Sequence, residues 1–387
     1  MRKVAVIGVG MTPFGISEKT NVEMFAEAAM EAIGDARIEP KEIEALFLGN
    51  AFGEFEEGQT NLASFAAAEI GVPHIPATRF EGACASATVA IRHAVMAVAG
   101  GFSDLVIAGG TEKAWSMGTP YATRVFATAM DSRYEFPAGA TFPSVFGMMA
   151  HLYSKKYGVP LTRLKEQMAL VAVKNHGNGF LNPKAHLRKK ITLQDVLSSM
   201  MVCDPLQLYD CCPFSDGAAA VILTTAAKAR KMAVKAVFVA GVGQCGAGRL
   251  SDQMDLTRVK SRELSAQQAY QQAGLTPKDI DVCELHDCFT IAEIVASEGL
   301  GFFEMGKGGE ALEKGETKIG GRISINPSGG LKAKGHPVGA TGAAQVYEIV
   351  KQLRGECGER QVEGAKVGLV DTLGGDLGVT CNLILRS

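Results

Sequence analysis

The sequence lacks the features that mark nucleic-acid-binding and membrane-spanning proteins. Its 39 lysines and arginines nearly balance its 41 aspartates and glutamates, and it has neither a basic run nor a block of like charge. No uninterrupted apolar stretch reaches the roughly 18 residues that a membrane span needs. A predicted strand begins at about residue 3, which leaves no room for a signal peptide. We therefore expect a chain that binds no nucleic acid and no membrane.

The nine cysteines show neither a disulfide framework nor the spacing of a zinc site. Nine is an odd number, and the adjacent Cys211 and Cys212 cannot bridge in ordinary disulfide geometry. No Cys-x-x-Cys pair and no cluster of histidine and cysteine at zinc spacing occurs. We therefore expect free thiols, no bound metal and a reducing, cytoplasmic location.

The residues that are abundant are typical of a dense α/β protein. Hydrophobic residues make up 47% of the 387 residues, and 45 glycines suit many tight turns between strands and helices. Runs of valine, isoleucine, leucine and alanine alternate with helical stretches, which favours largely parallel sheets covered on both faces. The chain is long enough for two or three domains, each with its own core.

The most informative pattern is an internal repeat. Residues 4–10 (VAVIGVG) return as residues 237–243 (VFVAGVG), and later in each copy an apolar helix precedes a short strand and a Gly-Gly pair. Cys84 opens this helix in the first copy, and His336 opens it in the second. Packing of the two halves about a local twofold axis would bring the two helix starts, and these two reactive side chains, toward each other.

The repeat predicts three segments. Residues 1–114 with 211–235 form an N-terminal half, residues 236–387 form a C-terminal half, and residues 115–210 form an insertion that the second copy lacks. The insertion is rich in aromatic residues and methionine. These side chains either face a substrate or form the core of a small subdomain, and the second role is the commoner one for such residues.

Cys84 lies where a glycine-containing turn leads into a helix of small and apolar residues. The free N–H groups and the positive dipole end of a helix start would stabilise a thiolate, so we expect the pKa of Cys84 to be lowered. A buried structural cysteine is the alternative, since that is the usual role of a free cysteine.

Two further segments carry groups that could react. His336 is flanked by glycines in residues 334–342 (KGHPVGATG), which implies unusual backbone conformations or close approach by a ligand. His286, Asp287 and Cys288 follow one another where a predicted strand ends, the place where α/β sheets carry their chemistry. A lone histidine is more often structural and Asp287 could merely cap the next helix, but the pairing of His336 with Cys84 in the repeat favours catalysis.

These elements together resemble the thiolase superfamily over the whole chain. The run from Gly335 to Gly342 (GHPVGATG) is its most specific mark. At two places the sequence differs from most thiolases and resembles the sterol-carrier-protein type and the archaeal-type thiolases. It has His-Asp-Cys-Phe at residues 286–289, and it has Thr372 where other thiolases carry a second catalytic cysteine. The resemblance implies a duplicated, five-layered αβαβα fold with two mixed, mostly parallel sheets and a short insertion.

The resemblance also implies a role for each reactive group. Cys84 would be the nucleophile and His336 its base, while Cys288 would exchange the proton at C2 of the acyl-CoA. His336 and His286 would bind the enolate oxygen. The backbone N–H groups of Cys84 and Gly374 would bind the oxygen of the acyl-enzyme.

The ligands and partners follow from the same resemblance. Acyl-CoA and CoA would be substrates, with Asn326, Ser328 and Gly329 assigned to CoA binding; no cofactor would be bound permanently, and no metal is needed. We expect a homodimer or a dimer-based oligomer. A small partner subunit with a zinc ribbon and an OB fold is a further expectation, because some short thiolases work with one.

Several alternatives stay open at this stage. The chain could be a decarboxylating or hydroxymethylglutaryl-type condensing enzyme, or an inactive thiolase-like scaffold or lipid-binding subunit, although Cys84, Cys288 and His336 are all present. The substrate could be acetoacetyl-CoA, or a bulky aromatic or branched 3-oxoacyl-CoA from anaerobic degradation. The physiological direction, cleavage or condensation, is equally open.

Overall fold

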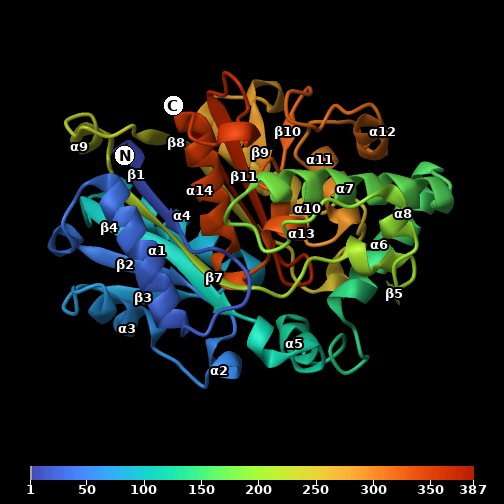
Figure 1. Cartoon of the computed structure of the whole chain (residues 1–387), viewed down its shortest axis with the longest axis horizontal. Helices are drawn as coiled ribbons and strands as arrows, with labels where there is room; N and C mark the ends of the chain where they lie inside the picture. The colour runs from blue at the N-terminus through green and yellow to red at the C-terminus, as the bar shows by residue number, and fades with distance from the viewer. Residues whose placement is uncertain (1) are drawn as a thin grey trace.

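Ten strands form one continuous sheet in the computed structural model, which describes residues 2–387 (Figure 1). The strands of the first half are β1 (Val4–Met11), β2 (Ala45–Gly49), β3 (Ala77–Phe80), β4 (Leu105–Lys113) and β7 (Asp216–Thr225). Those of the second half are β8 (Val237–Gly246), β9 (Val282–Glu284), β10 (Ser324–Ile325), β11 (Val367–Gly374) and β12 (Val379–Arg386). β5 (Met201–Cys203) and β6 (Leu206–Gln207) form a separate two-stranded sheet.

The two halves have the same strand order and the same strand directions, which confirms the duplication. The order runs β3-β2-β4-β7-β1 in the first half and β10-β9-β11-β12-β8 in the second. β2 is parallel to β3 and β4, and β9 is parallel to β10 and β11; β7 and β12 run antiparallel to their neighbours. A short antiparallel pairing of β1 with β8, Ala5 opposite Phe238 and Val6 opposite Val237, joins the two mixed sheets edge to edge.

The helices complete five layers (Figure 1). α4 (Ser86–Gly100) and α14 (Thr341–Arg354) pack against each other between the two halves of the sheet, as predicted for the helices that follow Cys84 and His336. α1 (Asn21–Ala36) and α3 (Leu62–Glu69) cover the outer face of the first half, and α10 (Lys260–Ala273) packs on the outer face of the second. The remaining helices outside the insertion are α2 (Gly53–Glu56), α9 (Ala226–Ala229), α11 (Thr290–Gly299), α12 (Gly308–Glu313) and α13 (Gly330–Lys334).

The continuous apolar runs of the strands arise because both faces of each half are buried. In β1, Val4 and Val6 point into the central core around α4 and α14, whereas Ala5 and Ile7 point into the outer core beneath α1. Successive side chains of a strand point to opposite faces, so a strand buried on both sides must be apolar at nearly every position.

The central helices approach each other closely and are apolar. A Cβ on Gly342 would lie 1.8 Å from the Thr88 hydroxyl oxygen, so only glycine permits this contact between α14 and α4. The segment Ala83–Gly100 also has the length and mean hydropathy of a membrane span, although Arg92 and His93 interrupt its apolar run. Its position between the sheets, with 61% of its residues buried inside the protein, is that of a core helix.

The insertion lies between β4 and β7, whereas residues 375–378 alone join the equivalent strands β11 and β12. It contains α5 (Thr119–Phe126), α6 (Phe142–Tyr157), α7 (Leu161–Leu181) and α8 (Leu193–Leu197) as well as β5 and β6. α6 and α7 pack on α11 of the second half and share a core with it. Phe146 and Met149 belong to that core.

Candidate active site

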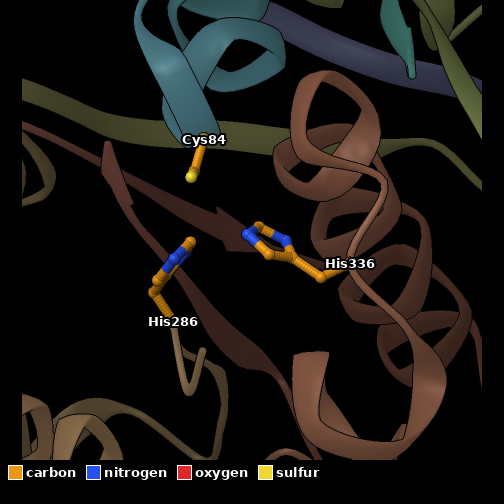
Figure 2. A group of neighbouring side chains, drawn as sticks. All are labelled: Cys84, His286 and His336. Atoms are coloured by element: carbon orange, nitrogen blue, oxygen red, sulfur yellow. The ribbon is translucent and has the colours of Figure 1, made fainter. Parts of the chain in front are cut away.

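The equivalent helix starts of the two halves meet and bring three reactive side chains together. The 3-10 turn Ala83–Ala85 precedes α4, and the turn Val338–Ala340, which precedes α14, contacts it. Cys84 lies in the first turn, His336 lies just before the second, and His286 follows β9. Figure 2 shows the three side chains converging. The sulfur of Cys84, one ring nitrogen of His286 and one of His336 all lie within 4.8 Å of one another.

The turn that carries Cys84 is held in an unusual backbone conformation. Ala83 has a φ of 47°, in the left-handed region that a residue with a Cβ rarely adopts. Ser86 stabilises the turn, because its hydroxyl donates to the Ala83 carbonyl at 2.6 Å and accepts the Gly82 N–H at 3.0 Å. Backbone strain of this kind persists only where surrounding contacts hold the residue in place, and it occurs most often at functional sites.

The prediction of a lowered pKa for Cys84 is wrong. Burial raises the pKa of the Cys84 thiol to about 12. The backbone N–H groups of Gly375 and of Cys84 itself face the sulfur and oppose this shift, but the desolvation of a thiolate is the larger effect. The resting Cys84 side chain is therefore a neutral thiol.

His336 is neutral, and its surroundings select one tautomer. Burial lowers the pKa of the imidazole to about 3. Its Nδ1 lies 2.7 Å from the Thr341 hydroxyl, and that hydroxyl donates its one hydrogen to the Pro337 carbonyl at 2.9 Å. The Thr341 oxygen must therefore accept the Nδ1–H of His336. This leaves Nε2 unprotonated and available to accept a proton from a ligand or from Cys84.

His286 lies perpendicular to His336, with the two ring centroids 5.2 Å apart. Its side chain is buried, and burial, together with the neighbouring His336, lowers the pKa far below its ordinary value. No protein group bonds its Nδ1 among the residues that the structure describes, and the backbone N–H of His286 points to Asp371 at 3.4 Å. A neutral imidazole of this kind can donate a hydrogen bond to an oxygen in the site.

Three further thiols line the same cavity: that of Cys288 is buried, and those of Cys211 and Cys212 are half-buried. Cys288 was predicted, and burial raises its pKa well above that of an ordinary thiol. Cys212 was not predicted: it also lines the cavity, and its backbone N–H donates to the Cys288 carbonyl at 3.0 Å. The sequence offered no signal for this, because residues 212 and 288 come together only through an antiparallel contact between distant segments.

The predicted oxyanion donor Gly374 directly precedes the residue whose N–H faces the Cys84 sulfur. Gly375 lines the cavity and directs its N–H to the Cys84 sulfur, whereas Gly374 is the last residue of β11. Gly374 instead allows a close approach, because a Cβ there would lie 2.2 Å from the Gly82 carbonyl oxygen. The two N–H groups at the sulfur are therefore those of Cys84 and Gly375.

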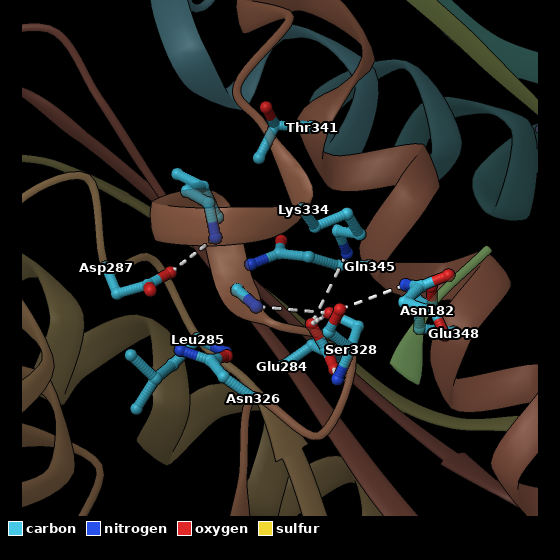
Figure 3. Close-up of polar contacts among 12 residues, drawn as sticks. Asn182, Glu284, Leu285, Asp287, Asn326, Ser328, Lys334, Thr341, Gln345 and Glu348 are labelled. Atoms are coloured by element: carbon cyan, nitrogen blue, oxygen red, sulfur yellow. Dashed lines mark hydrogen bonds and ion pairs between the residues drawn. The ribbon is translucent and has the colours of Figure 1, made fainter. Parts of the chain in front are cut away.

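None of the three residues assigned to CoA binding lines the cavity, and all three are buried. Figure 3 shows Asn326 and Ser328 among polar contacts with neighbouring segments of the chain. Ser328 donates to the Glu284 carboxylate at 2.6 Å, and the Asn326 side chain accepts the Leu285 N–H at 2.9 Å. Gly329 has a φ of 104° and packs where a Cβ would lie 2.7 Å from Gly179 of α7. These contacts fix the chain segments next to His286 and His336, so the assignment to CoA is wrong.

A buried carboxylate fastens the His336 loop to the first half of the molecule. Glu112 of β4 accepts the N–H groups of Ala51, Phe52 and Gly339 at 3.0, 3.0 and 2.8 Å. Gly339 belongs to the turn that follows His336, so Glu112 links the loops of both halves. This role of Glu112 was not predicted, because nothing in its local sequence distinguishes it from a surface glutamate.

A cavity of about 420 Å³ contains the reactive side chains. Cys84, His286, Cys288 and His336 all line it. A larger hollow of about 570 Å³ lies at the seam of β1 and β8, but it is lined by neither a thiol nor an imidazole among the described residues. The smaller cavity is therefore the candidate active site.

This site defines an enzyme of acyl transfer. A thiol with an adjacent neutral base can attack a carbonyl carbon, and the N–H groups at the sulfur can bind the oxygen that becomes negative. The duplicated five-layered fold, with a cysteine and a histidine at equivalent helix starts, is the arrangement that the resemblance to thiolases implies.

Comparison with known proteins identifies the family. Residues 4–227 match the family model "Thiolase, N-terminal domain", and residues 243–387 match "Thiolase C-terminal domain-like". An acetyl-CoA acetyltransferase of Methanothermobacter thermautotrophicus is 47% identical over 97% of both chains. Human sterol carrier protein 2 is 34% identical over 97% of this chain and 70% of that protein. The solved structure of an "Ltp2-ChsH2(DUF35) aldolase" superposes with a TM-score of 0.84 at 28% identity, covering 100% of this chain and 98% of that one. The chain belongs to the thiolase family.

Proposed function

We propose that the chain catalyses the CoA-dependent cleavage of a 3-oxoacyl-CoA, or the reverse condensation, through an acyl-Cys84 intermediate. The convergence of Cys84 with two neutral histidines carries the proposal. The archaeal acetyl-CoA acetyltransferase, 47% identical over nearly the whole chain, supports acetoacetyl-CoA as the generic substrate.

The first half-reaction starts from the neutral thiol and the neutral imidazole. The Cys84 sulfur attacks the 3-keto carbon while its proton moves to Nε2 of His336, which Thr341 leaves free to accept it. The N–H groups of Cys84 and Gly375 bind the oxygen that becomes negative. The bond between C2 and C3 then breaks, and its electron pair forms the enolate of the departing acyl-CoA.

The second half-reaction restores both thiols. Cys288 gives its proton to C2 of the enolate, whose oxygen is bound by His286, and the resulting acyl-CoA, which is acetyl-CoA when C2 carries no substituent, leaves. The Cys288 thiolate then takes the proton of an incoming CoA thiol, and the CoA sulfur attacks the acyl group on Cys84. His336 returns its proton to the Cys84 sulfur as that sulfur leaves. In the direction of condensation the same groups act in reverse order.

We also propose the assembly and the location. The aldolase to which this chain is similar carries DUF35 in its name, which supports a small partner subunit here as well. A homodimer or dimer-based oligomer and a cytoplasmic location complete the proposal, and the nine free cysteines suit a reducing compartment. CoA is a co-substrate in this scheme and not a resident cofactor.

The test is the cleavage of acetoacetyl-CoA by the purified chain, with and without CoA, followed by chromatography of the products. A thiolase yields two acetyl-CoA only when CoA is present; an aldolase, the activity named for the similar structure, needs a 3-hydroxyl group for retro-aldol cleavage and would leave acetoacetyl-CoA intact. Cys84→Ala should abolish acylation by any acyl-CoA, and retained acyl transfer would remove Cys84 as the nucleophile.

The role of Cys288 has a separate test. Cys288→Ala should slow cleavage of the C2–C3 bond by about 10²- to 10⁴-fold, the contribution of a general acid–base, yet leave acylation of Cys84 by acetyl-CoA largely intact. Cys212→Ala is the matched control, since it removes a neighbouring thiol of the same cavity. If Cys212→Ala gives the larger loss, the proton-transfer role belongs to Cys212.

A further inference from the structure

The walls of the active-site cavity are apolar beyond the reactive groups. Apart from the histidines and thiols, the side chains that line it are apolar except for two, Thr119 and Thr123. No lysine, arginine, aspartate or glutamate lines it. The part of a substrate that enters this space must therefore be uncharged, so the nucleotide of CoA stays outside.

One wall is an aromatic cluster on the Cys84 side. Phe126 stacks on Phe52 with ring centroids 4.9 Å apart and meets Phe214 edge-on at 5.1 Å. Cys84 packs against the same cluster. Because each ring is held by its neighbours, this wall cannot collapse onto a small acyl group.

The insertion supplies this wall through one face of α5. Thr119, Thr123 and Phe126 are spaced by four and three residues, so they share a face of the helix, and all three line the cavity. The lining also includes Phe146 of α6, which stacks on Phe289, the neighbour of Cys288 in the chain, with ring centroids 4.6 Å apart. The insertion thus faces the substrate and also joins the core, which combines the two explanations offered for its composition.

The mouth of the cavity is formed by its exposed lining residues, among them Trp115 just before α5, which is 45% exposed. Met200, Val202 and Leu208 line it, and they are 67%, 41% and 50% exposed. The pantetheine arm of CoA is long, thin and uncharged, and it can enter between these side chains. The acyl group attached at C3 then lies deeper, against Phe126 and Phe214.

We propose that the site selects 3-oxoacyl-CoA substrates whose C3 substituent is an aromatic ring or a group of similar bulk, with α5 setting the size limit. This inference rests on the thiolase function proposed above. An aryl ring can stack on Phe126 or meet Phe214 edge-on, as aromatic pairs prefer. The methyl group of acetoacetyl-CoA leaves most of that wall in contact with water, and burial of apolar surface is the main source of discrimination in such a pocket.

The experiment compares two substrates that differ only at this position, benzoylacetyl-CoA and acetoacetyl-CoA, each with excess CoA. We expect kcat/KM for benzoylacetyl-CoA to exceed that for acetoacetyl-CoA by at least about tenfold, the lower end of what one methylene contributes in an apolar pocket. Equal values, or a preference for acetoacetyl-CoA, would overturn the inference and leave the thiolase function standing. If neither is cleaved and acetyl-CoA does not acylate Cys84, both proposals fail.

Variants at Thr123 test the role of α5. Thr123→Trp fills the space beside Phe126 and should lower the ratio of kcat/KM for benzoylacetyl-CoA to that for acetoacetyl-CoA by at least about tenfold. Thr123→Ser, which keeps the hydroxyl and adds no bulk, is the matched control and should leave this ratio close to that of the wild type. A tryptophan variant that keeps the aromatic preference, with its fold verified by an unchanged melting temperature, would show that the ring binds elsewhere.

Discussion

The pH dependence of Cys84 alkylation tests the protonation state on which the mechanism depends. Burial places the pKa of the Cys84 thiol at about 12 and that of the His336 imidazole at about 3, so the proton resides on sulfur throughout the physiological range. A thiol with an ordinary pKa of 9.0 is about 1% ionised at pH 7, and at a pKa of about 12 the ionised fraction is about a thousandfold smaller. Such a thiol should react slowly with iodoacetamide.

The assay is the rate of inactivation by iodoacetamide between pH 6 and pH 10, with the Cys84 peptide followed by mass spectrometry. Alkylation requires the thiolate, so the rate constant should rise about tenfold for each pH unit and reach no plateau in this range. N-acetylcysteine, measured in parallel, provides the reference for an exposed thiol. A plateau below pH 8, or reaction faster than the reference at pH 7, would show a thiolate–imidazolium pair and refute the neutral resting state.

Three further predictions concern residues that act on the site through others. Thr341→Val removes the acceptor for Nδ1 of His336 and should lower kcat by about 10- to 100-fold with little change in KM, whereas Thr341→Ser should restore kcat. Glu112→Gln leaves some of the N–H groups of Ala51, Phe52 and Gly339 without an acceptor; chemical denaturation should show a loss of about 2–5 kcal/mol, and an unchanged midpoint would contradict the linkage. Asp371→Asn breaks a buried ion pair with Arg262 at 3.0 Å and should lower the free energy of unfolding by about 3–5 kcal/mol. A melting temperature within about 2 °C of that of the wild type corresponds to a loss of roughly 1 kcal/mol or less and would disprove this prediction.

Most of the fold follows from patterns that are local in the sequence. The repeat of residues 4–10 at 237–243 predicted β1 and β8, and the apolar helices after Cys84 and His336 proved to be α4 and α14. The short strand β3 was not predicted, because its four residues are only partly buried at the edge of the sheet and show no continuous apolar run.

The site was predicted where a reactive side chain coincides with a local backbone signal. Cys84 and His336 follow glycine turns at helix starts, and His286 and Cys288 follow a strand, so each could be recognised without its neighbours. Asn326, Ser328 and Gly329 lie in an equally distinctive loop, yet their contacts are with Glu284, Leu285 and Gly179, and they serve the fold. A loop motif alone does not distinguish a ligand contact from a structural one.

The sequence alone determines the duplicated topology and the meeting of Cys84 with His336, because equivalent residues of a repeat occupy equivalent places about its twofold axis. The protonation of these two groups is set by the folded molecule, since desolvation depends on every segment packed around them and outweighs the local helix start. Folding also places the Gly375 N–H at the sulfur and the Thr341 hydroxyl at Nδ1 of His336, which fixes the tautomer. Hydrogen-bond direction and burial are properties of three-dimensional neighbours, and a linear pattern contains neither.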